Sequence, residues 1–340
     1  MEIKKRDGSI DILRFIALAG IILVHINPPS FWCQIRGFDV PLMVFLSGIV
    51  YGRGTSNNDS KQPYLQYCGK RFKRLVIPTW FFLLFYYVIL YSGLVLRGHS
   101  LEIDSSEIIH NFTLMTGWYV WIIRVFLLIA LLSPFIYKYS ASVNIGVLLL
   151  TYVSILVLFE LFYIPRQDSV PYYLTMTIPY MLFFSLGSVI NRFNGRVLSV
   201  IGIVGFVVFV TYAISYYISE GQFITTDVKK YPPLLYYTSY ALFVIVLLWL
   251  TRDYIYKAFV YININKAFEW IGSHTLWVYF WHIIAVTFFT NHFDSWILRF
   301  IIAFGFGTIV AWIQSRIVIA ITTRCNSSAF NRNINIFFNT

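Results

Sequence analysis

Long apolar runs separated by short polar connections make up most of this sequence. We distinguish ten such segments, and most are close to the roughly 20 residues that a helix needs to cross the hydrocarbon core of a membrane. They cover residues 10–27, 38–52, 75–96, 118–137, 142–162, 170–190, 197–218, 233–250, 272–290 and 296–316. The second is short, so it is tilted, partly re-entrant or extended by flanking residues. The pattern predicts an all-α, multi-pass integral membrane bundle of about ten transmembrane helices.

The composition agrees with this prediction. Of the 340 residues, 58% are hydrophobic and 12% are charged, whereas a soluble protein carries roughly 25% charged residues. Aromatic residues make up 20%, with many Tyr and Trp near segment ends, where amphipathic rings favour the headgroup zone. The net charge of +11 is explained by membrane topology and anionic lipid, because no soluble basic domain exists to bind nucleic acid.

The distribution of Lys and Arg sets the orientation. With the N-terminus in the cytoplasm, 18 of the 26 fall on the cytoplasmic side, six fall outside, and two lie within spans. This bias follows the positive-inside rule, so both termini are expected to be cytoplasmic. We expect one transmembrane domain over residues 1–320 and a short cytoplasmic tail over 321–340.

Arg14 and His25 are the most informative ionisable residues, because both lie in the first apolar segment. Eleven residues separate them, which places them on nearly the same helical face and about 16 Å apart along the axis. Ionisable groups at such depth usually face a polar cavity and mark function. The alternative is that each side chain snorkels to its nearer interface.

A second group of cations stands at the cytoplasmic start of the third segment, in CGKRFKRLVIP: Lys70, Arg71, Lys73 and Arg74. A helix would present Arg71 and Arg74 on one side, and such a pair suits a phosphate-bearing ligand. The alternative is an anchor on anionic lipid.

Three further residues are candidates. His274 and His282, eight residues apart in the ninth segment, would share a face, although buried neutral histidines of the core are the default interpretation. No third ligand follows at a helical offset, so we predict no metal site. Asp39 begins the second segment on the same side as His25, where it would orient the imidazole or simply cap its helix.

Arg124 is another intramembrane cation, and Glu160 is its possible partner in a structural pair between helices. Neither a Walker loop, a GxSxG elbow nor an HExxH motif is present in the sequence.

Five motifs, in order, resemble those of the membrane-bound acyltransferase-3 family. Arg14 and His25 match its Arg-X10-His signature, and the other four are DVPLMVFLSGIVY (39–51), RFKR (71–74), WYVW…LLSP (118–134) and IGSHTLWVYFWH (271–282). There are two departures: Thr275 stands where serine is usual, and Arg124 stands where a small or neutral residue is expected.

The resemblance implies an enzyme that moves an acyl group, commonly acetyl from acetyl-CoA, onto an extracytoplasmic acceptor. That acceptor is often a sugar hydroxyl of a surface polysaccharide such as O-antigen or exopolysaccharide. The chain looks closest to stand-alone polysaccharide O-acetyltransferases, including the fucose O-acetylase-like subgroup. The resemblance further implies a multi-pass protein of the bacterial inner membrane, whose partners are the bilayer, acetyl-CoA and a polysaccharide or lipid-linked saccharide.

The resemblance also implies a role for each candidate. Phosphates of CoA would be bound at the inner mouth of a passage by Arg71 and Arg74, with Lys70 or Lys73. Arg14 would line that passage, and His25 would act as general base or carry the acetyl group transiently. Asp39 would orient His25, and His282 would be a second proton-transfer group.

Two other functions fit a chain of this kind. A non-enzymatic flippase or exporter of a lipid-linked saccharide would also have many spans and cations in a cavity. A glycan polymerase would place its catalytic residues outside, but we would expect a large arginine-rich outer loop. The longest outer segments here, 97–117 and 219–232, hold one Arg between them.

Overall fold

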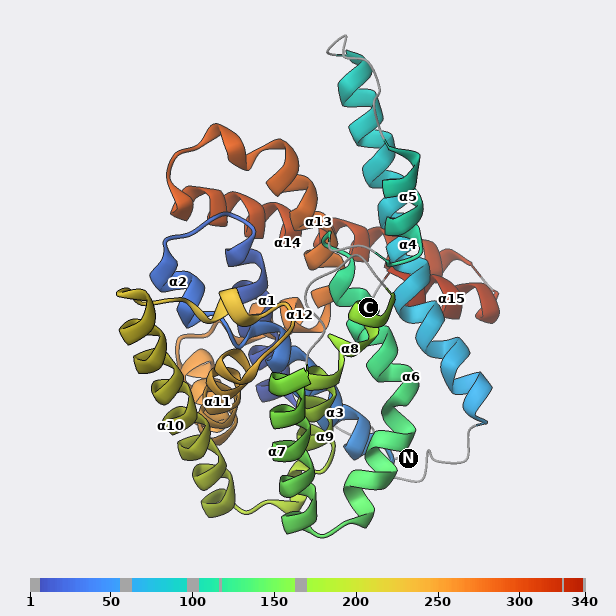
Figure 1. The fold of residues 1–340 in the computed structure, drawn as a ribbon. Helices are drawn as coiled ribbons and strands as arrows, with labels where there is room; N and C mark the ends of the chain where they lie inside the picture. The colour runs from blue at the N-terminus through green and yellow to red at the C-terminus, as the bar shows by residue number, and fades with distance from the viewer. Residues whose placement is uncertain are drawn as a thin grey trace. The chain divides into compact units, whose positions relative to one another are not determined.

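The computed structural model describes residues 7–55, 63–96, 104–115, 118–162, 170–325 and 327–338. Within these residues the regular structure is helical, with a single isolated β-bridge between Lys230 and Pro233 (Figure 1). The all-α fold class is thereby confirmed.

The α-helices are α1 (Gly8–Val24), α2 (Ser30–Ile35), α3 (Asp39–Thr55), α4 (Tyr64–Leu96), α5 (Ser105–Phe112), α6 (Trp121–Ser142), α7 (Ile145–Phe162), α8 (Val170–Thr175), α9 (Ile178–Ser188), α10 (Gly195–Glu220), α11 (Leu235–Tyr261), α12 (Asn265–Ser273), α13 (Thr275–Phe288), α14 (Trp296–Arg324) and α15 (Ser328–Phe338). Short 3₁₀ turns cover Ile190–Arg192, Thr226–Lys229 and Thr290–His292.

Every one of the ten predicted segments contains helix, but several bounds differ. The helix expected over 75–96 begins at Tyr64, and the segment 170–190 is divided into α8 and α9. Among the described residues, seven stretches are long and apolar enough to cross a membrane, and α13 is a shorter apolar helix. A multi-pass membrane bundle is therefore supported, while the count of ten and the side of each terminus stay predictions.

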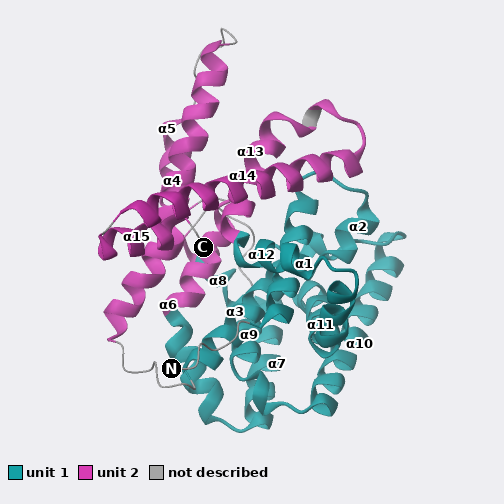
Figure 2. Ribbon diagram, turned by 180° about the vertical axis from the view of Figure 1, so that it is seen from behind, with its two compact units in different colours: residues 1–60, 132–167, 174–275 teal, residues 61–131, 168–173, 276–340 magenta. Residues whose placement is uncertain are grey.

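The chain forms two compact units, shown in different colours in Figure 2. Unit 1 comprises residues 1–60, 132–167 and 174–275, and unit 2 comprises residues 61–131, 168–173 and 276–340.

In unit 1, α3 and α9 pack with their backbones in close contact. A Cβ atom at Gly48 would overlap the carbonyl oxygen of Phe184, and one at Gly187 would overlap the carbonyl oxygen of Phe45. Glycine on both helices thus allows an approach that any side chain would prevent. α3 is thereby held along its length, and it carries the buried Asp39 at its first position.

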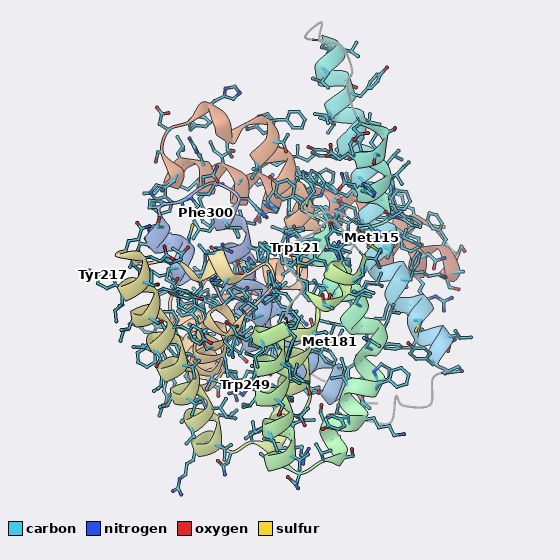
Figure 3. The ribbon with its side chains drawn as sticks, in the orientation of Figure 1. Met115, Trp121, Met181, Tyr217, Trp249 and Phe300 are labelled. Carbon is cyan, nitrogen blue, oxygen red and sulfur yellow. The ribbon has the colours of Figure 1, made fainter. Side chains whose placement is uncertain are left out.

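Aromatic rings pack α1 of unit 1 against α11 and α12. Phe15 of α1 packs against Phe259 and Phe268, at ring-centroid distances of 6.3 and 4.3 Å. Trp249 of α11 is buried, whereas Tyr217 near the end of α10 is exposed; both are labelled in Figure 3. α10 also exposes many aliphatic side chains, which is the pattern of a helix that faces lipid.

Unit 2 is built around α4, α13 and α14. Phe82 of α4 stacks on Phe280 of α13, with ring centroids 4.7 Å apart and an interplanar angle of 7°. Trp281 of α13 donates its indole N–H to Oε1 of Gln314 on α14, at 2.8 Å. These contacts join α13, which carries His282, to α14 and to α4. Helix α4 carries four cations, which we call the α4 cations: Lys70, Arg71, Lys73 and Arg74.

Candidate functional site

α1 carries both Arg14 and His25. The helix runs from Gly8 to Val24, and His25 follows as its C-cap with helical backbone angles (φ −75°, ψ −7°). The 3.6-residue periodicity therefore extends through His25 and keeps the two side chains on one stripe of the helix. Both residues are half-buried in unit 1. The expected helical relationship exists, and the catalytic roles of the pair stay predictions.

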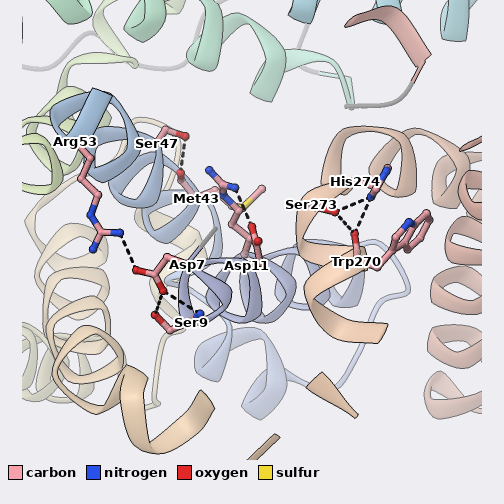
Figure 4. Close-up of polar contacts among 10 residues, drawn as sticks. Asp7, Ser9, Asp11, Met43, Ser47, Arg53, Trp270, Ser273 and His274 are labelled. Atoms are coloured by element: carbon pink, nitrogen blue, oxygen red, sulfur yellow. Dashed lines mark hydrogen bonds and ion pairs between the residues drawn. The ribbon is translucent and has the colours of Figure 1, made fainter. Parts of the chain in front are cut away.

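Arg14 is held by a buried carboxylate. Its Nη1 donates to Oδ1 of Asp11 at 3.1 Å, and the Asp11 side chain is 3% exposed (Figure 4). A charge-assisted bond of this kind fixes the direction of a guanidinium and offsets the cost of placing its charge among apolar groups. Sequence reasoning missed Asp11 as this partner, although its i,i+3 spacing was a usable signal.

The start of α1 is tied to the end of α3. Asp7 caps α1 by accepting from the backbone N–H of Ser9 at 3.1 Å, and it accepts from Nη1 of Arg53 at 2.7 Å (Figure 4). Burial raises the pKa of the Asp7 carboxyl, but hydrogen bonds from Arg53 and Ser9 outweigh it and leave the pKa below its ordinary value. This contact holds the end of α1 that precedes Arg14.

Asp39 belongs to a cluster of four charges, which we call the four-charge cluster. Three of its members are buried and Asp227 is half-buried: Arg36, Asp39, Asp227 and Lys230. Asp39 is 0% exposed and accepts from Nη1 of Arg36 at 2.8 Å, while Nζ of Lys230 lies 3.9 Å from its other oxygen. Arg36 also donates to Asp227. Two cations and two carboxylates make the cluster neutral, which is what permits its burial.

The four-charge cluster joins two segments of unit 1: the segment from α2 to the start of α3, and the connection between α10 and α11. Lys230 is buried with the cluster, and burial lowers the pKa of its ammonium group, although the nearby Asp39 carboxylate counteracts this. The backbone N–H of Thr226 donates to Oε1 of Gln34 at 2.8 Å, which adds an uncharged link between the same segments.

The position of Asp39 bears on its predicted role beside His25. A Cβ atom built at Gly20 of α1 would lie 3.1 Å from Cβ of Asp39, so Asp39 packs against that part of α1. Gly20 is five residues before His25, which is about 140° around the helix. The Asp39 contacts in this structure are with Arg36 and Lys230, and an orienting effect on His25 stays a prediction.

Sequence reasoning missed Arg36, Asp227 and Lys230 as members of a cluster with Asp39. Arg36 and Asp39 are three residues apart, which is a local signal for pairing. Asp227 lies 191 residues from Arg36, and no local pattern links the two.

The α4 cations lie within the helix rather than at its start. Helix α4 begins at Tyr64, so Lys70, Arg71, Lys73 and Arg74 occupy its second and third turns, with side chains that are exposed or half-buried. The guanidinium of Arg71 lies 4.9 Å from the ring centroid of Tyr67. Arg71 and Arg74 are one turn apart, as expected, in unit 2.

His282 is completely buried in α13. Its Nδ1 is hydrogen-bonded to the backbone carbonyl of Tyr279, which can only accept, so Nδ1 carries the proton. In the neutral ring, Nε2 is then the basic nitrogen. This arrangement is compatible with proton transfer and equally with a structural histidine of the core.

The expectation that His274 shares a helical face with His282 is wrong, because the helix breaks between them. α12 ends at Ser273, and α13 begins at Thr275. His274 caps α12, stacks on Trp270 at 4.2 Å, and its Nδ1 lies 2.7 Å from Oγ of Ser273 (Figure 4). These local contacts replace the continuous helix that apolar periodicity alone predicted.

Arg124 and Glu160 have separate partners. In unit 2, Arg124 donates to the carbonyl of Leu114 at 2.5 Å and lies 4.0 Å from the ring centroid of Tyr173. In unit 1, Glu160 accepts from the backbone N–H of Leu235 at 2.9 Å, at the N-terminus of α11. An unpaired N–H at a helix start is a natural site for a carboxylate.

Comparison with known proteins gives one result. The family model described as "Acyltransferase domain", of the acyltransferase-3 type, matches residues 7–316. Neither curated proteins nor solved structures give a significant match. The matched range contains Arg14, His25, the α4 cations and His282, together with all seven candidate spans apart from the end of α14. The chain therefore belongs to the acyltransferase-3 family of membrane acyltransferases.

Proposed function

We propose that this protein transfers an acetyl group from acetyl-CoA to a hydroxyl of an extracytoplasmic polysaccharide sugar in the bacterial inner membrane. The family membership supports acyl transfer, and the observation that carries the proposal is the placement of Arg14 and His25 on one stripe of α1. The imidazole suits a reaction that moves a proton, and the guanidinium, about 16 Å away on the same stripe, suits a passage for an anionic donor.

The donor is bound through its phosphates. Arg71 and Arg74 form a pair of planar donors that matches phosphate oxygens, and Lys70 and Lys73 add charge on the same helical turns. By binding the phosphate end of the donor, the α4 cations hold the thioester in position, although they do not contact the reacting carbon.

The chemical step needs a base. Neutral His25 removes the proton from the sugar hydroxyl as its oxygen attacks the thioester carbonyl carbon. The tetrahedral intermediate carries negative charge on the former carbonyl oxygen. Arg14, about 16 Å from His25 along α1 and held by Asp11, lines the passage and binds the phosphate-bearing part of the donor instead. Collapse breaks the C–S bond, the acetyl ester is formed, and the sulfur of CoA leaves with the proton from His25.

The test uses the purified full-length protein in nanodiscs, radiolabelled acetyl-CoA and an oligosaccharide acceptor. Wild type is expected to form an O-acetyl ester, and His25→Ala to form at least 100-fold less, because general-base catalysis contributes about 10²–10⁴-fold. The matched control is His110→Ala, which removes an exposed histidine of α5. Ester formation by His25→Ala at the wild-type rate would exclude His25 from the mechanism, and saccharide transport without ester, measured with the protein in sealed vesicles, would favour a flippase.

A further inference from the structure

The C-terminal helix α15 (Ser328–Phe338) is fastened at its end by side chains of two other helices of unit 2. The indole N–H of Trp277 on α13 donates to the carbonyl of Phe337 at 3.0 Å, and Nε2 of Gln314 on α14 donates to the carbonyl of Phe338 at 2.8 Å. Terminal carbonyls of a helix have no partner within it, so these donors cap α15.

The orientation of the Gln314 amide is set by a second indole. Trp281 donates to Oε1 of Gln314, which leaves Nε2 as the donor toward α15. At its other end, α15 is tied to α14, because Nδ2 of Asn331 donates to the carbonyls of Thr322 and Cys325 at 2.9 and 2.7 Å. An 11-residue helix is too short to be stable alone, so these contacts determine where it lies.

α15 also packs on α4. The ring centroid of Phe338 lies 5.1 Å from that of Phe81 on α4 and 5.6 Å from that of Trp277, with which it is nearly parallel. Phe337 adds a wider contact with Phe81 at 6.5 Å. The end of α15 is thus held between α4 and α13.

Phe81 shares a stripe of α4 with two of its cations. It follows Arg74 by seven residues and Lys70 by eleven, and at 100° per residue both offsets return to within about 20° of the same face. α15 therefore contacts α4 on the stripe that carries Arg74 and Lys70 toward the N-terminus.

Pro78 stands between the cations and this contact. Proline inside a helix lacks the N–H that continues the hydrogen-bond ladder, and its ring bends the helix. Lys70 lies eight residues, or about 12 Å, before Pro78, so a change of about 10° in this bend displaces it by about 2 Å. That displacement is enough to lose a hydrogen bond to a phosphate.

We propose that α15 is a positioning element of the acyl-donor site. By holding α4 at Phe81, directly beyond Pro78, it sets the direction of the helical arm that presents Lys70 and Arg74 to a phosphate-bearing donor. The inference rests on the proposed function, in which these cations bind the phosphates of coenzyme A. It adds a segment outside the residues matched by the family model, which end at 316.

The experiment measures binding of free coenzyme A to the full-length protein in nanodiscs by calorimetry, which needs no turnover. Phe338→Ala removes the closer of the two ring contacts with Phe81 of α4 and is expected to raise the Kd at least fivefold. It should also abolish the preference for coenzyme A over dephospho-coenzyme A, because that preference depends on the placement of the cations. The matched control is Phe330→Ala on the same helix, whose side chain is 42% exposed, and its Kd should equal that of wild type.

A general loss of stability would not remove the preference for the additional phosphate, so that preference separates positioning from folding. Should Phe338→Ala fail to fold, Trp277→Phe keeps an aromatic ring at this position but loses the N–H donor to Phe337 together with part of the ring area, and is expected to raise the Kd in the same direction. An unchanged Kd and preference in both variants overturns the role of α15 and leaves the proposed function intact. Tighter binding, which would mean that α15 obstructs the donor, also overturns it. Wild type that does not bind coenzyme A refutes the donor assignment itself.

Discussion

Removing Arg36 from the four-charge cluster is expected to destabilise the protein more than most single substitutions. Arg36 is 3% exposed, and it faces Asp39 at 0% and Asp227 at 23% side-chain exposure. Arg36→Met leaves two carboxylates, Asp39 and Asp227, with Lys230 as the remaining cation of the cluster. The Asp39 carboxylate is fully buried. Deleting one partner of a buried ion pair costs about 3–5 kcal/mol, mostly because the other charge stays buried and uncompensated.

The cost should fall when the opposing charge is removed too. Arg36→Met with Asp39→Leu leaves Lys230 with Asp227 and replaces the closest pair by apolar groups, and such replacements are often nearly neutral. We expect the double variant to recover at least about 2 kcal/mol of the loss caused by Arg36→Met.

The measurement is equilibrium unfolding in mixed micelles with increasing SDS, followed by tryptophan fluorescence. The reference pair is Asp7 with Arg53, whose side chains are 36% and 34% exposed, and Arg53→Met should cost no more than about 1 kcal/mol. The reasoning is refuted if Arg36→Met costs no more than Arg53→Met, or if the double variant is less stable than Arg36→Met.

Three further outcomes are expected. Arg14→Lys should lower acetyl transfer at least tenfold in the labelled acetyl-CoA assay while the protein still folds, because an ammonium does not reproduce a planar guanidinium held by Asp11; wild-type turnover would contradict this. Gly187→Val should prevent the close contact of α3 and α9 and lower the midpoint of thermal unfolding by several degrees, whereas Gly195→Val, where a Cβ meets nothing within 4 Å, serves as the control. Asp7 has a folded-state pKa below its unfolded value of about 3.9, so its stabilising effect is full above that value and is lost as the pH falls through the lower folded pKa. Asp7→Asn should therefore reduce stability at pH 6 and flatten the loss of stability below pH 4, and an acid unfolding curve identical to that of wild type would contradict the sign.

Helices and their apolar character could be predicted from the sequence because both depend on local pattern. The ten segments contain helix, since membrane spans require long apolar runs and a helical backbone. Their bounds could not be predicted as well. The break at His274 depends on its capping and stacking contacts with Trp270, and these interrupt a run whose hydropathy is continuous.

The candidate site was predictable where its residues are close in sequence. Arg14 and His25 lie on the same helix, and the α4 cations lie within about one turn of one another. The four-charge cluster was not predictable, because Asp227 and Lys230 reach Arg36 and Asp39 only through the packing of distant loops. The distribution of Lys and Arg along the sequence does not distinguish Lys230, which is buried in a connection, from a lysine at the surface.

The burial of most of the four-charge cluster determines how its ion pairs respond to ionic strength. Counter-ions screen charges that water reaches, over about 8 Å at physiological ionic strength, but they screen buried charge pairs much less. The half-exposed contact between Asp7 and Arg53 should weaken as ionic strength rises, whereas the buried pair of Arg36 and Asp39 should change much less. The contact between Arg36 and Asp39 in unit 1 is thus expected to persist in media of very different salinity.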